Sequence, residues 1–239
     1  MSDIVPPPFR LHIFPDSAEL ADKVAALILH HAEEAITERG RFSIVLAGGN
    51  TPRAVYQRLR SAGGRWSRWD IYFGDERCVP RNNPARNDRM ARAAWLDHVP
   101  IPHGRIHKIP AELGAELGAR TYASTLEVIG DFDLVLLGLG EDGHTASLFP
   151  GHPLGASLNE PVALAVHDAP KPLPDRVSLS AARLSAARRV YFLVTGDGKR
   201  DALAQLTHGD DIPAAHIRPP SGVDFFITAD VLPVASSQE

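Results

Sequence analysis

The sequence has little cysteine, no excess of positive charge and no long apolar run, and each absence excludes a class of protein. The single cysteine, Cys78, cannot form a disulfide within the chain, which excludes a disulfide-stapled fold. No stretch approaches the roughly 18 uninterrupted apolar residues that a membrane span needs. The 25 Lys and Arg residues against 29 Asp and Glu residues give a net charge of -4, which argues against nucleic acid or an anionic membrane as partner. An anionic ligand must therefore be held by a local cluster of cations.

Length and composition indicate one ordinary globular domain. The chain has 239 residues and an apolar share of 44%, enough for one α/β core. It contains neither an internal repeat nor a long linker, so we expect a single domain over residues 1–239, as a monomer or a weak homo-oligomer. Residues 1–8 lack a basic region followed by an apolar core, so no signal peptide is expected. Together with the single cysteine, this predicts a cytoplasmic location.

Apolar runs alternate with amphipathic segments along the chain, which is typical of an α/β protein. Predicted strands cover residues 42–47, 70–73, 133–137, 161–166, a short segment at Arg176, 190–195 and 224–228. Predicted helices run between Asp16 and Gly40, from Pro52, and over residues 88–96, 111–129, 180–188 and 199–206. This alternation predicts a Rossmann-like α/β fold, a mostly parallel sheet with helices on both faces.

The segment 138–150 is the strongest indication of function. It directly follows the buried strand 133–137 and contains three glycines, which let the backbone approach a ligand at the carboxyl end of that strand. His144 lies in this turn, ahead of a short segment expected to start a helix. Imidazole is the side chain best suited to proton transfer near neutral pH, so His144 is the candidate general base. A hydrogen-bonded structural histidine is the alternative.

The same glycines match the G-x-G-x-x-G pattern of dinucleotide-binding proteins, but their context does not fit. That pattern normally lies in the first strand–helix turn of its unit, whereas Gly138, Gly140 and Gly143 lie in the middle of the chain. Glu141 and Asp142 would also bring like charge to a pyrophosphate. We therefore expect no nicotinamide cofactor.

The 11 histidines contain no hydrolytic metal motif. No pair of them has the two-histidine-plus-glutamate spacing of a zinc hydrolase. His30 and His31 are adjacent, so they are expected to point to different faces of their helix. We expect neither a catalytic metal nor a cofactor.

Residues 47–52 form a second candidate site, for an anion. They directly follow the strand 42–47 and read Ala-Gly-Gly-Asn-Thr-Pro. Thr51 is a favourable helix cap, and Pro52 stands at the preferred first helical position. The free N–H groups of such a helix start, beside two glycines, favour phosphate. An ordinary strand-to-helix turn is the alternative.

Further candidates follow other strand ends. After the strand 70–73, Arg77 is suited to bind an anion through two N–H groups, and Asp75 to orient a base or a substrate hydroxyl. A solvated acidic loop is the alternative there. Cys78 has no feature that would activate a thiol and is expected to be structural. Three cations lie at strand ends or in a loop beside the sheet: Lys171, Arg176 and Lys199.

Four segments occur in order along essentially the whole chain. They are 47–52, 73–80 with Arg86 and Asn87, 138–150, and 174–180 followed by 195–203. Together they resemble the 6-phosphogluconolactonase family, and four segments in order are a specific signal. Asn50 and Arg86 depart from the family pattern, since serine is usual at both positions.

This resemblance implies a fold shared with glucosamine-6-phosphate deaminases and hydrolysis of 6-phosphoglucono-1,5-lactone in the pentose phosphate pathway. The partner is then a phosphorylated sugar lactone. We expect His144 to take a proton from water and return it to the ring oxygen, with Asp75 and Arg77 completing the catalytic set. The predicted substrate-binding residues are Gly48, Gly49, Asn50, Thr51, Gly143, Arg176 and Lys199.

Two other functions stay open at this point. An amino-sugar-phosphate deaminase is similar in the glycine loop and the histidine, but typically has tyrosine where this chain has Arg77. A non-catalytic sugar-phosphate sensor would need a DNA-binding module. The first predicted helix starts near residue 16, which leaves no room for such a module before it.

Overall fold

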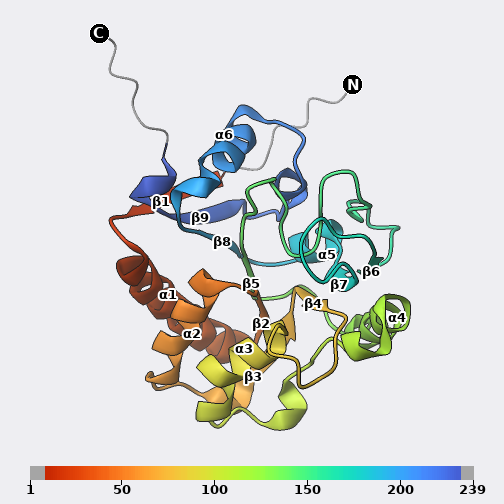
Figure 1. Ribbon diagram of the computed structural model, residues 1–239. Coiled ribbons are helices and arrows are strands. Elements are labelled where there is room, and N and C mark those ends of the chain that lie inside the picture. Colours follow the sequence, from red (N-terminus) through yellow and green to blue (C-terminus); the bar gives the residue numbers. More distant parts are fainter. Residues whose placement is uncertain (1–8, 233–239) are drawn as a thin grey trace.

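The computed structural model describes residues 9–232, and its centre is a parallel sheet of six strands (Figure 1). Residues 1–8, on which the expectation of no signal peptide rests, lie outside the described part, as do residues 233–239. The strand order is β1-β9-β8-β5-β2-β3. Their bounds are β1 Phe9–Phe14, β2 Phe42–Leu46, β3 Trp69–Phe73, β5 Leu134–Leu137, β8 Val190–Val194 and β9 Val223–Thr228.

The inner strands are apolar on both faces because both faces of the sheet are covered. Every residue of the inner strands β2, β5 and β8 is buried, and so is every residue of β3 at the edge of the sheet. All pairings in this sheet are parallel, for example Val45 of β2 beside Val135 of β5. Parallel strands buried on both faces read as continuous runs of Val, Ile and Leu, which is why the sequence predicts them well. The predicted fold class is confirmed.

Helices cover both faces of the sheet. Their bounds are α1 Ser17–Arg39, α2 Asn50–Arg60, α3 Asn87–Ala94, α4 Ala115–Leu126, α5 Ala181–Ser185 and α6 Arg200–His208. In Figure 1, α1 and α2 lie on the left of the sheet, while α4 and α5 lie on the right. Asp16 caps α1 by accepting the N–H groups of Ala18 and Glu19, and Gly40 ends it with φ 78°. Within residues 9–232 we find no helix long and apolar enough to cross a bilayer.

Two predicted strands belong to a separate antiparallel sheet. β6 (Ala163–Val166) and β7 (Arg176–Leu179) pair with each other, and β4 (Asp75–Arg77) pairs with the other side of β7. In β4 and β7, Arg77 lies opposite Arg176. This small sheet therefore brings two of the predicted cations together beside the main sheet.

Several local predictions were wrong. No helix follows His144; instead Thr145 and Leu148 form an isolated antiparallel bridge. The helix predicted for residues 180–188 is capped by Ser180 as expected but ends at Ser185. β1 was not predicted at all. It is an edge strand that pairs only with β9, so most of its residues stay exposed and it lacks a buried pattern.

Candidate active site

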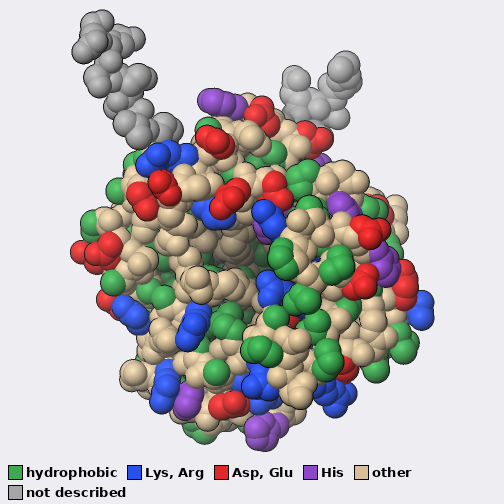
Figure 2. All heavy atoms as spheres, in the orientation of Figure 1, with side chains coloured by type: hydrophobic (Ala, Val, Ile, Leu, Met, Phe, Trp, Pro, Cys, Tyr) green, Lys and Arg blue, Asp and Glu red, His purple; other side chains and the backbone are tan. Residues whose placement is uncertain are grey.

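The predicted site residues meet in a cavity at the carboxyl ends of β2, β5 and β8. The cavity has a volume of about 400 Å³, and Figure 2 shows a hollow near the middle of this face with Lys and Arg side chains at its rim. β3 and β5 lie on opposite sides of β2, so the chain order reverses here. Such a switch point is where open α/β sheets bind ligands. The predicted residues that line it are Gly48, Gly49, Asn50, Thr51, Asp75, Arg77, His144, Arg176 and Lys199.

His144 is paired with a carboxylate that the sequence did not single out for catalysis. Its Nδ1 donates to Oδ1 of Asp142, two residues earlier in the same turn. Partial burial opposes ionisation of Asp142, but the hydrogen bond from His144 prevails and lowers the pKa of that carboxyl group. An ionised carboxylate can only accept, so in the neutral imidazole the proton lies on Nδ1 and the lone pair on Nε2. Nε2 is therefore the nitrogen available for proton transfer.

The backbone around His144 leaves space for its ring. A Cβ at Gly140 would lie 1.9 Å from Nδ1 of His144, so only glycine fits there. On its other side, the imidazole packs on the ring of Phe149, with 4.7 Å between the centroids. The ring is thus fixed by packing and by Asp142, and a pre-positioned base needs no reorganisation before it reacts.

Asp75 is engaged by two neighbours rather than free to act as a base. Its Oδ1 accepts from Nδ2 of Asn87 at 3.0 Å, and its Oδ2 accepts from Oγ of Ser147 at 2.6 Å. A Cβ at Gly48 would lie 2.0 Å from Oδ1 of Asn87, so the glycine loop and Asn87 are in close contact. Asp75 therefore links Asn87, which contacts the glycine loop, to the buried Ser147.

Arg77 and Arg176 supply positive charge that no carboxylate in residues 9–232 neutralises through an ion pair. Nη1 of Arg77 donates to the carbonyl of Ala85 at 2.6 Å, and its buried Nε has no partner among the described residues. Arg176 donates to the carbonyls of Pro172 and Leu173. Burial lowers the pKa of Arg176, although Asp75 opposes the shift. An arginine stays charged in proteins, so both side chains favour an anion.

The helix start that was expected to bind phosphate is present, but its cap differs from the prediction. α2 begins at Asn50, with Gly49 as N-cap and no side-chain cap hydrogen bond, because Thr51 lies inside the helix. Oγ1 of Thr51 instead lies 2.7 Å from Oγ1 of Thr195. Since no side chain caps it, the N-terminus of α2 presents N–H groups to the cavity. Lys199 stands nearby in the lining, with Nζ 3.6 Å from Oε1 of Glu141.

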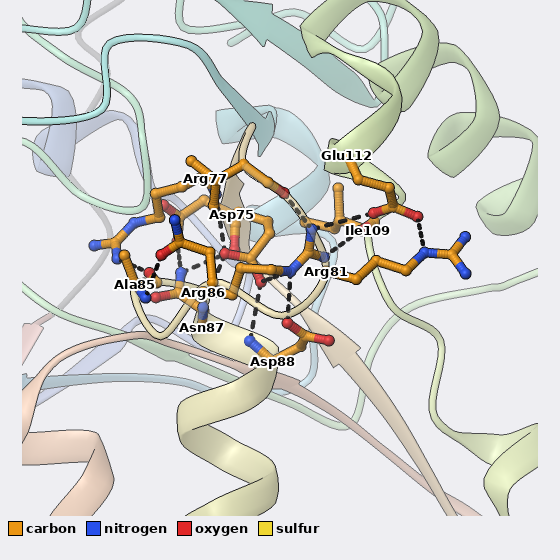
Figure 3. Close-up of polar contacts among 12 residues, drawn as sticks. Asp75, Arg77, Arg81, Ala85, Arg86, Asn87, Asp88, Ile109 and Glu112 are labelled. Carbon is orange, nitrogen blue, oxygen red and sulfur yellow. Dashed lines mark hydrogen bonds and ion pairs between the residues drawn. The ribbon is translucent and has the colours of Figure 1, made fainter.

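Two residues discussed from the sequence lie elsewhere. Gly143 is not part of the cavity lining, and its N–H donates to the carbonyl of Gly140, so the geometry does not support it as a substrate-binding residue. Arg86 is only 2% exposed and contacts Asp88 and Glu112 away from the cavity (Figure 3). Its departure from the family pattern therefore does not touch the cavity wall.

Three residues of the site were not among those predicted from the sequence: Asp142, Asn87 and Ser147. Asp142 stands two residues before the histidine in a glycine turn, and this Asp-x-His spacing was a usable local signal. Asn87 and Ser147 contact Asp75 from 12 and 72 residues away in sequence. Pairings at such separations depend on the fold, and periodicity does not report them.

A cluster suited to a metal lies outside this cavity. His30, His31 and Glu34 of α1 offer ligand atoms within 4.8 Å of one another. Both histidines reach the carboxylate of Glu34, at 3.3 and 2.9 Å, although His30 is exposed and His31 is turned toward Tyr191. Cys78 is half-buried, and burial raises its thiol pKa to about 11, which fits a structural thiol.

Comparison with known proteins identifies the family. Residues 15–226 match the family model described as glucosamine-6-phosphate isomerases/6-phosphogluconolactonase. The chain belongs to this family. Proteins named 6-phosphogluconolactonase from Streptomyces coelicolor and Homo sapiens are 36% and 35% identical to it, covering 84% and 91% of this chain and 83% and 90% of theirs.

Solved structures of this family share the fold. The 6-phosphogluconolactonase of Thermotoga maritima has a TM-score of 0.85 at 27% identity, covering 92% of this chain and 100% of its own. A monomeric glucosamine-6-phosphate deaminase has a TM-score of 0.79 at 19% identity, covering 93% of this chain and 98% of its own. The second likeness shows the fold alone.

Proposed function

We propose that this chain hydrolyses 6-phosphoglucono-1,5-lactone to 6-phosphogluconate in the oxidative pentose phosphate pathway. The names of its relatives support the reaction. The observation that carries the proposal is the content of one cavity of about 400 Å³. It holds a histidine paired with Asp142 and three cations, Arg77, Arg176 and Lys199. A phosphorylated lactone needs both a proton-transfer group and cations.

In the proposed mechanism, His144 acts first as base and then as acid. Nε2 takes a proton from water while the water oxygen bonds to C1 of the lactone. The tetrahedral intermediate then breaks its bond from C1 to the ring oxygen, and the imidazolium returns the proton to that oxygen. Asp142 holds the ring and stabilises its charged form. General acid–base assistance of this kind contributes about 10²–10⁴-fold.

The developing negative charge on the lactone carbonyl needs donors that are already in place. The N–H groups of the Gly48–Gly49 loop and the guanidinium of Arg77 line the cavity and serve this purpose in the proposal. Asp75 positions this wall through Asn87 and Ser147 instead of exchanging a proton. Asp75, expected from the sequence in the catalytic set, is therefore a positioning residue in this proposal.

The phosphate is assigned to a different set of groups from those that face the lactone carbonyl. It carries about −1.5 to −2 charges at neutral pH. Lys199, Arg176 and the uncapped N-terminus of α2, with Asn50 and Thr51, are the groups that would hold it. Lys199 is suited to this role because, among residues 9–232, its Nζ forms one ion pair, a long one to Glu141 at 3.6 Å.

The expectations for domain organisation, oligomeric state and location belong to the same proposal. The chain would act as a single domain, as a monomer or a weak homo-oligomer, in the cytoplasm and without metal or cofactor. Size-exclusion chromatography checks the oligomeric state. We expect lactone hydrolysis to survive dialysis of the enzyme against a chelator. A loss of activity that a divalent cation restores would contradict the expectation of a metal-free reaction.

The experiment that tests the function follows the disappearance of freshly generated 6-phosphogluconolactone, with the spontaneous reaction subtracted. We expect strong acceleration by the enzyme. In parallel, ammonia release from glucosamine 6-phosphate is measured, and none is expected. A rate no higher than the blank in the first assay, with ammonia released in the second, would replace the lactonase by the deaminase.

A further inference from the structure

Glu76 is a buried carboxylate directly behind the cavity wall. It lies in β4 between Asp75 and Arg77, which both line the cavity. Successive side chains of a strand point to opposite faces, so Glu76 points away from the cavity, and it is only 1% exposed. A buried carboxylate that touches no substrate must be held by donors within the protein.

Those donors are backbone N–H groups of the residues that form the cavity wall. Oε1 of Glu76 accepts from the N–H of Arg77 at 2.9 Å and from that of Asn87 at 2.8 Å. Oε2 accepts from the N–H of Asp88 at 2.9 Å. Asn87 and Asp88 begin α3, whose N-cap residue Arg86 makes no side-chain cap hydrogen bond. Glu76 therefore caps α3 from a different element.

Arg86 provides the countercharge that this buried group needs. Its Nε lies 3.7 Å from Oε2 of Glu76 and 2.8 Å from Oδ1 of Asp88. Its other nitrogens reach Oε2 of Glu112 at 3.1 Å and the carbonyl of Ile109 at 3.0 Å (Figure 3). The planar guanidinium binds all these acceptors at once, which the single ammonium of a lysine cannot do.

The contacts of Asn87 transmit the position of α3 to the cavity. Nδ2 of Asn87 donates to the carbonyl and to Oδ1 of Asp75, both at 3.0 Å. Its Oδ1 lies against Gly48, where a Cβ would come within 2.0 Å. A shift in the backbone of Asn87 must therefore move Asp75 or the glycine loop, because these contacts leave no free space.

We propose that Glu76, held by Arg86, is a positioning residue of this site: it fixes the backbone of Arg77 and Asn87 and through them the cavity wall that faces the lactone. This inference rests on the proposed function. Glu76 itself contacts no substrate. Its contribution is to hold in one geometry the donors that act on the lactone, since a misplacement of about 1 Å can cost a factor of about 10² in rate.

The first test is Glu76→Gln, with Asp133→Asn as the matched control. Gln keeps the size of Glu76 but supplies one acceptor oxygen, so at least one N–H loses its partner. Asp133 is also a buried carboxylate that accepts a backbone N–H, that of Ser43, and pairs with an arginine, Arg39. It directly precedes β5 and so lies at the amino end of that strand, whereas the cavity lies at the carboxyl ends. Both variants are expected to have a lower Tm.

Kinetics of the folded proteins separate positioning from stability. For Glu76→Gln we expect kcat/KM for the lactone to fall about 10- to 100-fold, mainly in kcat because Lys199 and Arg176 are untouched. For Asp133→Asn we expect wild-type kcat. Equal loss of Tm in both variants with wild-type kcat in both would overturn the proposal, because Glu76 would then be merely structural.

Amide hydrogen exchange gives a readout that needs no activity. The N–H groups of Arg77, Asn87 and Asp88 are expected to exchange faster in Glu76→Gln, and unchanged protection overturns the proposal. If wild-type protein does not accelerate lactone hydrolysis, the proposed function fails, while exchange still decides the positioning. If Glu76→Gln does not fold, Arg86→Lys replaces it, and the same changes in kcat and exchange are expected at a smaller size. Wild-type values for both in Arg86→Lys would contradict the inference.

Discussion

The main sheet has a polar cavity at each end of its strands. We call the side where the strands begin the amino edge and the side where they end the carboxyl edge. The two cavities differ in how their charged side chains are paired. The cavity at the amino ends of the strands is the larger, about 550 Å³ against about 400 Å³ at the carboxyl ends. At the amino edge each cation faces a carboxylate: Arg10 pairs with Asp224 at 2.7 Å and Arg39 with Asp133 at 2.8 Å. At the carboxyl edge Arg77 forms no such pair within residues 9–232.

This difference in ion pairing shows that the volume of a cavity alone does not indicate where a substrate binds. Ion pairs at the amino edge neutralise its arginines and tie the strand ends together, so an incoming anion gains little there. At the carboxyl edge Arg77 and Arg176 are held by backbone carbonyls and form no ion pair within residues 9–232, so their charge is less neutralised than that of the arginines at the amino edge. Positive charge beside the His144–Asp142 pair is what suits a phosphorylated, hydrolysable substrate.

The largest effect is expected from His144→Ala. Loss of the base should lower kcat by about 10²–10⁴-fold, and the Tm should fall only slightly, through loss of the hydrogen bond to Asp142. The matched control is His12→Ala at the amino edge, where His12 also pairs with an aspartate, Asp224. Steady-state kinetics of both variants check this, and a wild-type kcat in His144→Ala would remove the proposed base.

Gly140→Ala should come next. The added Cβ would lie 1.9 Å from Nδ1 of His144, so the ring must move away from Asp142, and we expect kcat to fall about 10- to 100-fold. Gly130→Ala is the control, because a Cβ there meets nothing within 4 Å. If Gly140→Ala turned over at the wild-type rate, the fixed placement of the imidazole would not matter to the reaction.

The parts of the site that the sequence predicts lie within short segments. The buried runs of β2 and β5, the glycine segment after each and His144 were all evident, because each signal lies within a few neighbouring residues. The three charged residues of β4, Asp75–Arg77, have no strand propensity. They form a strand only because β7 provides an edge for them.

The rest of the site depends on contacts between distant segments. Ser147 and Asn87 converge on Asp75 only after the small sheet has formed. The Thr-Pro sequence predicts Thr51 as the helix cap, and this prediction was wrong. The helix starts one residue earlier, at Asn50, and its cap is Gly49 with φ 104°. The backbone geometry after the end of β2 therefore outweighs the local capping preference of Thr51.

A smaller effect, confined to binding, is expected from Lys199→Ala. Loss of one charge-assisted contact to phosphate should raise KM about 10-fold or more with little change in kcat. Arg188→Ala at the amino edge is the control, since Arg188 faces Asp133 at 3.6 Å and should leave KM unchanged. Initial rates over a range of lactone concentrations measure both. A fall in kcat at constant KM for Lys199→Ala would contradict its assignment to the phosphate.

The smallest effect concerns stability against pH. Although partial burial opposes it, the hydrogen bond from His144 lowers the pKa of Asp142, so the folded state favours the charged form. This stabilisation is fully present above about pH 4, the usual aspartate range, and is lost as the pH falls through the lowered value. Asp142→Asn should therefore be less stable than wild type at pH 7, with the two curves converging in acid.

Asp224→Asn provides the comparison at the other edge. Arg10 and His12 lower the pKa of Asp224 against the effect of burial, so its variant should converge with wild type in acid in the same way. Only Asp142→Asn should also lose kcat. Thermal unfolding from pH 3 to 7 checks both variants, and a constant gap between Asp142→Asn and wild type over that range would show that Asp142 does not contribute through its charge.

The most direct test of the account compares kcat/KM for 6-phosphogluconolactone with that for glucono-1,5-lactone, which lacks only the phosphate. Both rates are corrected for spontaneous hydrolysis. The cations that line the cavity at the carboxyl edge, Arg77, Arg176 and Lys199, predict a preference of about 100-fold or more for the phosphorylated lactone. Equal values for the two lactones, or no acceleration of either, would contradict the claim that charge at this edge selects the substrate.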